Sequence, residues 1–530
     1  HHDNSEGDKA LIPRCEHGVP PGDKERRDSQ DRNSDAAPVG DLEVVDVDTA
    51  EHYQHGEQDA RHGELPGEAV YEERAQVGNR AQRLHYHVSG RDPGAAVAKE
   101  GGVPLVIAVE RNKGYVSTYK LDVFKDGSGH DEESYGVVER IVKTLLWVYG
   151  GFKVTVAGSK KIYEKIADAY KKGGARQFDA DFMARVYERP FEVEYVENAA
   201  DAPKEHQAAD PVGRHLDGCR IGFDAGGSDR KVSAVVDGET VYSEEVVWFP
   251  KLQSDPDYHY QGILDAMKTA ASHMPRVDAI GVSSAGVYID NKIMIASLFL
   301  KVSDEDFEKK VKTMYLDVAK EIGENIPVEV ANDGDVTALA GAMDLNDNNV
   351  LGVAMGTSEA AGYVDSQGNI TGWLNELAFV PVDYCKDAMV DEWSGDYGCG
   401  VKYFSQDSVI KLAPAAGIEL DESLSPAEKL KVVQKLMAEG DERAAKIYDT
   451  IGVYFGYAIA YYAMFYDIKH VIIMGRVTSG EGGTIVLAKA NEVLKREYPE
   501  LAEKIRLHIP DEKSRRVGQS VAAASLPKLK

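Results

Sequence analysis

The first regular alternation of apolar and polar residues along the chain predicts β-strands. Residues 103–124 alternate on both sides of Asn112-Lys113-Gly114, which is typical of a β-hairpin. A helical repeat over 135–150 follows, and then a strand, a helix capped by Ser159 and further short segments up to residue 196. The pattern predicts an α/β domain over residues 98–200.

A longer pattern of strands and helices begins at residue 219, after a polar linker at 201–218. A strand and a hairpin come first, and helices, one of them over 307–323, then alternate with strands. Three more strands are predicted over 349–370, so one hairpin-led pattern is used twice. The sequence therefore predicts an α/β fold with two lobes, residues 219–345 and 346–515, and a ligand site between them.

The N-terminal leader, residues 1–97, contains no Phe, Trp or Met and is rich in charged residues, Gly and Pro. This composition cannot bury enough apolar surface to offset the entropy of ordering, so we expect a disordered leader. The first methionine of the chain is Met183. We infer that the recorded start could be truncated or wrong, and that the leader could lie outside the native protein.

The balance of acidic and basic residues limits the classes of partner that the chain could bind. Of the 530 residues, 89 are acidic and 61 basic, which gives a net charge of −28. This argues against nucleic acid, because neutralising phosphates requires clustered Lys and Arg. The four cysteines show neither disulfide nor zinc-ribbon spacing, which suits a reducing cytoplasm. The longest apolar run, 453–466, is too short to span a bilayer, so we expect no membrane partner.

Three glycine-containing turns follow predicted strands and could approach a bulky anion. In Asp224-Ala225-Gly226-Gly227-Ser228 the backbone and hydroxyl suit phosphate, and Asp224 could hold Mg²⁺ through water. The alternative is a hairpin turn with an incidental acid. Gly356-Thr357 forms a similar turn, and the direction of the following Glu359 stays open. Gly475 suits a flat nucleoside, or else belongs to a flexible surface loop. Walker and G-x-G-x-x-G loops are missing from the sequence.

The stretch EVANDGDVTALAG, residues 329–341, runs from a predicted strand directly into a predicted helix. Asp333 at this junction could serve as a catalytic base in phosphoryl transfer, which needs an oriented nucleophile and a base within hydrogen-bond reach. The alternative is that Asp333 or Asp335 only caps the helix. One residue could also serve both purposes.

Six motifs follow one another along the chain: FDAGGSDRK, GVSSAG, ANDGD, MGTSEAAGYV, NELAFVPV and FYDIKHVIIMGRV. In their order and approximate spacing the chain resembles the ROK family of sugar kinases and sugar-responsive regulators, which belongs to the actin-like ATPase superfamily. The resemblance covers about residues 219–528, and 98–200 lies outside it. It implies a two-lobed, ribonuclease H-like fold in which a C-terminal helix, 516–530, returns to the first lobe.

The resemblance implies an ATP- and Mg²⁺-dependent kinase of a sugar or similar polyol. Asn332 and Glu376 would bind the substrate, and Asp333 would accept the proton of the attacking hydroxyl. A homodimer is compatible with it. It assigns nucleotide contacts to Asp224, which would hold Mg²⁺ through water, and to Gly226, Gly227, Ser228, Gly356, Thr357 and Gly475.

Departures from the family pattern affect the substrate and the metal. Phe379 stands where many members have a histidine that binds both sugar and zinc, and of the family's zinc-loop cysteines only Cys399 remains. We therefore predict no zinc site and a changed substrate pocket. Ser358-Glu359 and Arg476 replace glycine-richer segments. We expect the loop 394–405 to be held by packing of Trp393, Tyr397, Tyr403 and Phe404.

Three functions compete at this point. The first is the sugar kinase. The second is a regulator or sensor without catalysis, although residues 98–200 show neither a helix-turn-helix pattern nor a basic recognition stripe. The third is hydrolysis of a nucleotide or polyphosphate, which would leave Glu376 without a role.

Overall fold

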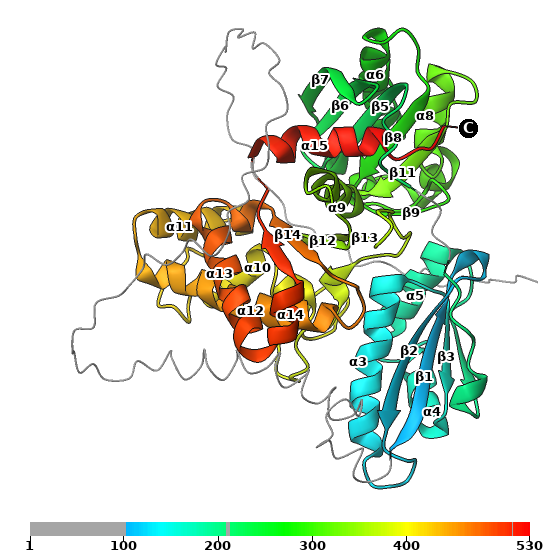
Figure 1. Cartoon of the computed structure of the whole chain (residues 1–530), viewed down its shortest axis with the longest axis vertical. Coiled ribbons are helices and arrows are strands. Elements are labelled where there is room, and N and C mark those ends of the chain that lie inside the picture. The colour runs from blue at the N-terminus through cyan, green and yellow to red at the C-terminus, as the bar shows by residue number, and fades with distance from the viewer. Residues whose placement is uncertain (1–101, 208–211, 511, 530) are drawn as a thin grey trace, which may run out of the picture. The chain divides into compact units, whose positions relative to one another are not determined.

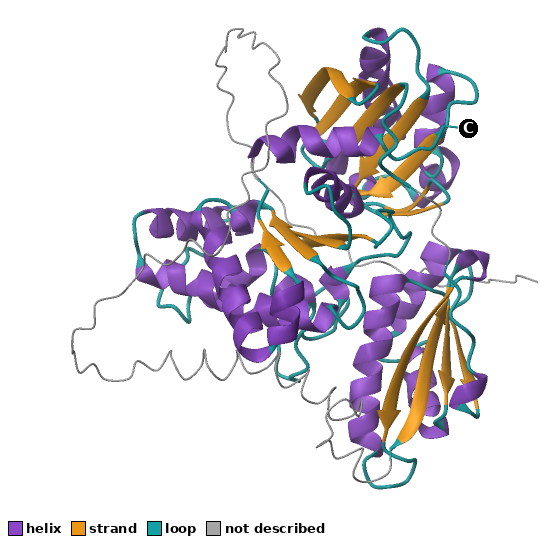
Figure 2. Cartoon of the chain, viewed as in Figure 1, coloured by secondary structure: helices purple, strands orange, loops and turns teal. Residues whose placement is uncertain are grey.

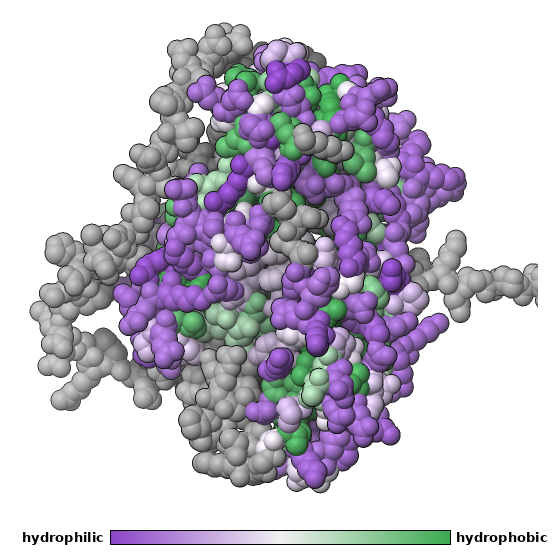
Figure 3. All heavy atoms as spheres, turned by 45° about the vertical axis from the view of Figure 1, so that its right-hand side comes forward, coloured by the Kyte–Doolittle hydropathy of each residue, from purple (hydrophilic) through white to green (hydrophobic). Residues whose placement is uncertain are grey.

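The computed structural model describes residues 102–207, 212–510 and 512–529, with only the backbone over 512–517 (Figure 1). The predicted leader lies outside these residues. Three sheets dominate the described part, each built from one of the three patterned regions of the sequence. Apolar side chains fill the cores beside the sheets, while hydrophilic side chains predominate on the face shown in Figure 3.

The first sheet has the order β2-β1-β3-β4. The predicted hairpin is β1 with β2, β3 pairs antiparallel to β1, and β4 is parallel to β3. Ser159 caps α4 as predicted, because its Oγ accepts a hydrogen bond from Ile162 N at 3.1 Å. The elements are β1 (Val103–Glu110), β2 (Val116–Val123), α3 (Asp131–Tyr149), β3 (Lys153–Ala157), α4 (Lys160–Tyr170), α5 (Gln177–Tyr187) and β4 (Glu192–Val196). We call this part the N-terminal domain.

The second sheet has the order β11-β8-β5-β6-β7. β5, β8 and β11 are parallel, whereas β6 and β7 run antiparallel as a hairpin-led extension. Its elements are β5 (Cys219–Ala225), β6 (Asp229–Val236), β7 (Glu239–Val247), α6 (Pro256–Ser272), β8 (Ala279–Ser284), α7 (Asp304–Asp306), α8 (Met314–Ile322), β11 (Val328–Asn332) and α9 (Asp333–Asp344). With its helices it forms the first lobe.

Two features of this lobe differ from the prediction. A short hairpin of β9 (Val287–Ile289) and β10 (Lys292–Ile295) was not expected, because each strand is too short to show a periodic pattern. The single helix predicted over 307–323 is wrong in its first part. There a wider π turn, Phe307–Val311, precedes α8, and Ile293 N bonds to Lys312 O across this break at 2.9 Å.

The third sheet, in the second lobe, has the order β13-β12-β14-β15 and carries a group of helices (Figure 2). Its elements are β12 (Val350–Met355), β13 (Glu359–Val364), α10 (Gln406–Leu412), α11 (Pro426–Ala438), α12 (Glu442–Tyr462), β14 (His470–Met474), α13 (Glu481–Glu497), α14 (Pro499–Lys504) and β15 (Arg506–His508). The third strand predicted in 349–370 is wrong, since only one bridge, Val364 to Ile370, forms there. Beyond it the backbone turns toward the N-terminal domain.

The last helix, α15 (Glu512–Ala524), returns to the first lobe as predicted. The Oγ atoms of Ser233 on β6 and Ser520 on α15 are 2.6 Å apart, and Arg220 on β5 donates to Pro527 O at 2.7 Å. The prediction of an α/β fold with two lobes and an additional N-terminal α/β domain is therefore confirmed. Within the described ranges, the model contains no helix that is both long and apolar enough to cross a membrane.

Candidate active site

The junction of β11 and α9 presents Asn332 and Asp333 side by side. Asn332 is the N-cap: its Oδ1 accepts from Gly334 N at 2.7 Å, and its Nδ2 donates to Gly286 O at 2.8 Å. The alternative in which Asp333 or Asp335 only caps the helix is therefore not what the structure shows. Asp333 Oδ1 also lies 3.0 Å from Gly334 N, which orients this carboxylate.

The first turn of α9 packs directly on β13, and this contact requires glycine. A Cβ atom at Gly334 would lie 2.2 Å from Ala361 O. The close approach allows Asp335 to reach across, where its Oδ1 accepts from Tyr363 N at 3.1 Å and from Asn375 Nδ2 at 2.8 Å. Sequence reasoning considered Asp335 only as a cap, and its link to Asn375 depends on folding rather than on any local motif.

Carboxylates from three motifs gather around Asp333. Burial raises the pKa of Asp224 to about 6 and that of Glu376 to about 8, and the nearby charge of Asp333 adds to both shifts. Burial also raises the pKa of Asp333 itself, against the opposing effects of the Gly334 N–H and the Lys251 ammonium. Asp335, also buried, has its pKa raised to about 7. Asp224 and Glu376 thus lie close enough to Asp333 for its charge to act on them, although neither lines the two cavities described next.

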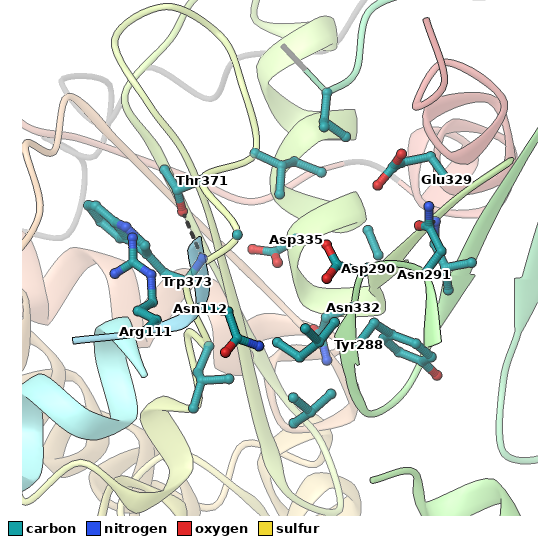
Figure 4. A pocket seen from close by; sticks show the side chains of 18 of the residues that line it. Arg111, Asn112, Tyr288, Asp290, Asn291, Glu329, Asn332, Asp335, Thr371 and Trp373 are labelled. Atoms are coloured by element: carbon teal, nitrogen blue, oxygen red, sulfur yellow. Dashed lines mark hydrogen bonds between the residues drawn. The ribbon is translucent and has the colours of Figure 1, made fainter. Parts of the chain in front are cut away.

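Two cavities meet the β11–α9 junction. Asn332 and Asp335 line the first, of about 320 Å³, together with Tyr288 and Trp373 (Figure 4). Asp333 lines the second, of about 390 Å³, together with Gly475. Consecutive residues at one strand end therefore border two separate cavities, which is an arrangement suited to joining two ligands.

The second cavity lies between α9 and the end of β14. Gly475 has φ of 103°, and a Cβ atom there would lie 2.3 Å from Met355 O, so a side chain is excluded. Arg476 and Ser479 continue this wall, while Thr337 and Gly341 of α9 face it. Of the predicted nucleotide residues, only Gly475 lines this cavity.

The first predicted phosphate turn is held by Trp248, whose Nε1 donates to Gly226 O at 2.7 Å and whose N donates to Ser228 O at 3.1 Å. Lys251 covers the turn, since a Cβ atom on Gly227 would lie 3.2 Å from Lys251 Nζ. The same ammonium lowers the pKa of Asp333. Lys251 therefore lies against this turn and near enough to Asp333 for its charge to act on that carboxylate, and no sequence motif pointed to it.

The second predicted phosphate turn is closed by a hydrogen bond from Gly356 N to Ser358 O at 2.9 Å, and Thr357 is exposed. Glu359 points inward: it is 3% exposed, and both carboxylate oxygens lack a hydrogen-bond partner among the described residues. Burial raises its pKa well above the ordinary value, which favours the neutral form over a charge that would repel an anion at the turn.

Phe379 and the loop after residue 390 lie in the region where the family resemblance implies departures from a zinc-binding pattern. Phe379 stacks on Trp147 of α3 with ring centroids 4.2 Å apart. Cys399 is buried, and burial raises the pKa of its thiol to about 12, which disfavours a metal-binding thiolate. Within 102–207, 212–510 and 512–529, no three His, Cys, Asp or Glu side chains are grouped to hold a metal.

A buried ionic cluster holds this loop instead. Asp396 receives Arg140 in a two-pronged contact at 2.9 and 3.1 Å, Arg176 Nη1 at 2.8 Å and Lys143 Nζ at 2.9 Å. The packing expected from the sequence contributes as well, since Tyr403 and Phe404 are buried, whereas Trp393 is 60% exposed. We call the following six residues the ionic cluster: Glu139, Arg140, Lys143, Arg176, Asp179 and Asp396.

Backbone contacts also tie α3 to the candidate site. Asn375 N donates to Val148 O at 3.0 Å, and Glu376 N donates to Trp147 O at 2.9 Å. These carbonyls belong to the last turn of α3, where helical partners are missing. The N-terminal domain therefore fixes the segment that carries Glu376.

The comparisons with known proteins agree with this geometry. The ROK family model matches residues 220–519, and the chain belongs to the ROK family. The matched residues cover the two lobes, each built on a mixed sheet. Among curated proteins, none matches the sequence.

Solved structures of both ROK enzymes and regulators are similar to this chain. A ROK hexokinase from Thermus thermophilus is 17% identical, with a TM-score of 0.46 over 58% of this chain and 97% of that one. A Streptomyces griseus ROK glucokinase, in complex with glucose and AMPPNP, is 19% identical, with a TM-score of 0.43 over 58% and 99%. A ROK transcriptional regulator, a homolog of E. coli MLC, is 18% identical, with a TM-score of 0.47 over 58% and 78%.

Proposed function

We propose that this chain is an ATP- and Mg²⁺-dependent kinase of a sugar or sugar-like polyol, working in the cytoplasm. The observation that carries the proposal is that Asn332 and Asp333, adjacent in the chain, line two different cavities. The first cavity would hold the acceptor and the second the nucleoside. Asp333 then stands where the two ligands would meet.

Each residue of the site would have its own role in the reaction. Asn332, fixed by Gly286 O, would bind a substrate hydroxyl, and Glu376 would accept a hydrogen bond from another. Asp333 would take the proton from the attacking hydroxyl, which requires it to be ionised. Lys251 favours that ionised form, because its positive charge lowers the pKa of Asp333.

The residues around Asp224 fit a magnesium-bound nucleotide. Asp224 is 6% exposed; its Oδ1 accepts from Ser283 Oγ at 2.8 Å and its Oδ2 lies 4.0 Å from Lys231 Nζ, so a water of the metal's shell would share this second oxygen with the ammonium. Bound Mg-ATP would supply the phosphoryl group and neutralise its charge. The backbone of Gly226 and Gly227, with the hydroxyls of Ser228 and Thr357, would bind the phosphates.

A second candidate is a ROK regulator that binds a sugar or nucleotide without catalysis. One observation favours it: neither phosphate turn lines either cavity. A kinase of this geometry must bring the turns to the second cavity when its ligands bind.

The test follows ADP release from Mg-ATP by the full chain over a panel of hexoses, amino sugars and polyols. Asp333→Asn is compared with Asp344→Asn, the same change at the other end of α9, about 16 Å away along the helix. Both carboxylates line the second cavity. Sugar-dependent turnover that only Asp333→Asn abolishes supports the kinase. Turnover without sugar indicates hydrolysis, and ligand binding without turnover indicates the regulator.

A further inference from the structure

Arg111 is a buried cation that no carboxylate neutralises in the part of the chain that the structure describes. It follows β1 and is 5% exposed. Its Nη1 donates to Ser117 Oγ and its Nη2 to Gln207 Oε1, both at 3.0 Å, and both acceptors are neutral. A guanidinium taken out of water without a counter-charge is costly, so such a residue calls for a partner from elsewhere.

The Arg111 side chain belongs to the wall of the first cavity. Figure 4 shows it beside Trp373 on one side of the cavity, while Glu329 and Asn291 lie on the other. Gln207 Oε1 also accepts from Trp373 Nε1 at 3.1 Å, so the same amide orients the guanidinium and the indole. Two regions more than two hundred residues apart thus build one wall.

The charges of this cavity are distributed unevenly. Lys113 at the wall is paired with Asp290 at 2.9 Å, which leaves Arg111 as its uncompensated cation among the described residues. Asp335 and Glu329 also line the cavity and provide acceptors for hydroxyl groups. A ligand that is anionic at one end and rich in hydroxyls at the other would match both sides.

We propose that the substrate of the first cavity is a sugar acid, a sugar or polyol that carries a carboxylate, and that the Arg111 guanidinium binds this carboxylate. This rests on the proposed function for the role of the cavity. A guanidinium has five N–H donors in a planar fork that matches a carboxylate, and two are already directed at Ser117 and Gln207. Its remaining donors are left for the ligand.

A carboxylate fits better than a phosphate. The acidic residues of the cavity would repel a doubly charged phosphate more than a singly charged carboxylate. The volume of about 320 Å³ is at the small end of ligand pockets, roughly 300–1,000 Å³, and therefore suits one sugar unit. The N-terminal domain, which lies outside the family's region, would accordingly select the substrate.

The test measures binding by calorimetry to the full chain without nucleotide. The ligands are a hexose, its aldonic acid, its uronic acid and its 6-phosphate. The variants are Arg111→Gln, Arg111→Lys and the control Lys113→Gln, a neighbouring exposed cation already paired with Asp290. Thermal unfolding of each variant shows whether it is folded, and Arg111→Lys keeps the buried charge if Arg111→Gln does not fold.

We expect a sugar acid to bind the parent at least tenfold more tightly than the hexose. Arg111→Gln should weaken acid binding by about 10- to 100-fold and leave hexose binding within threefold, as expected for hydrogen bonds to a charged group. Arg111→Lys should lose part of the preference, and Lys113→Gln should keep it. Equal binding of acid and hexose, a preference for the 6-phosphate, or an unchanged preference in folded Arg111→Gln would overturn the proposal.

The outcome for the kinase is read separately. Asp333→Asn should keep the preference for the acid over the hexose, because Arg111 and not Asp333 lines the first cavity. Acid binding without ADP release would support the role of Arg111 and contradict the kinase. Phosphorylation of neutral sugars alone would support the kinase and overturn the role of Arg111.

Discussion

Replacing Asp396 by asparagine would remove one of three carboxylates from the ionic cluster and leave three cations facing two acids. Asp396 is 2% exposed and contacts Arg140, Lys143 and Arg176, all of them buried. Glu139 retains Arg140 at 2.7 Å and also Arg176, while Lys143 keeps only Asp179 at 3.3 Å. The variant therefore buries one unmatched positive charge.

Breaking a buried ion pair on one side typically costs about 3–5 kcal/mol. Such a loss is a large part of a domain's stability of roughly 5–15 kcal/mol and should lower the melting temperature by on the order of 10 °C. The cost should fall if Lys143→Met is added, because two cations would then face two carboxylates. The two substitutions should therefore be strongly non-additive.

The assay is thermal and guanidinium unfolding of the full chain for Asp396→Asn, Lys143→Met and the double variant. Glu392→Gln is the matched control, since this carboxylate is in the same loop, binds Lys402 and is 74% exposed. Lys402 is itself buried but keeps Asp407 at 2.9 Å, so losing its exposed partner should cost less than about 1 kcal/mol. If Asp396→Asn unfolds with the midpoint of the parent, the cluster does not hold this loop and the reasoning fails.

Three further predictions concern the site. Burial raises the pKa of Glu376 to about 8 from an ordinary 4.5, so the folded state loses stability as pH rises through this range; Glu376→Gln should match the parent at pH 5 but melt higher at pH 9. Lys251→Met should move the acid limb of the plot of kcat against pH to higher pH, because Lys251 lowers the pKa of Asp333. An acid limb at the same pH as in the parent would exclude this effect of Lys251 on Asp333. Gly334→Ala should destabilise by about 1–3 kcal/mol through overpacking, whereas Gly136→Ala, with no atom within 4 Å of the added carbon, should stabilise by about 0.5–1 kcal/mol in melting experiments.

Features encoded within a few residues could be predicted from the sequence. The hairpin of β1 and β2 follows from alternation around one turn, and the Ser159 cap from one hydroxyl before a helical repeat. The Asn332-Asp333 junction was identified because a strand end and a helix start are both local signals. Its capping residue was not, because either acid or the amide could supply an oxygen.

Features made by distant segments could not be predicted. One such feature is the absence of the predicted third strand from the sheet of the second lobe. The N–H groups of Asn375 and Glu376 bond to the last carbonyls of α3 instead of to a neighbouring strand. Arg111 and Asp396 are others: neither is part of a motif, and each gains its importance from partners across the fold. Ionic contacts of this kind have no period along the chain.

The N-terminal domain contacts the two lobes through different kinds of ion pair: buried toward the second lobe and partly exposed toward the first. Its contact with the second lobe includes the ionic cluster and backbone hydrogen bonds. Its contacts with the first lobe include packing of α5 against β9 and β10 and the ion pairs Glu188–Lys312 and Lys113–Asp290, the latter with side chains 54% and 57% exposed. Exposed pairs are weakened by salt. We therefore expect the domain to move together with the second lobe. Salt would weaken its ion pairs with the first lobe, so ionic strength should affect how readily the first cavity admits a ligand.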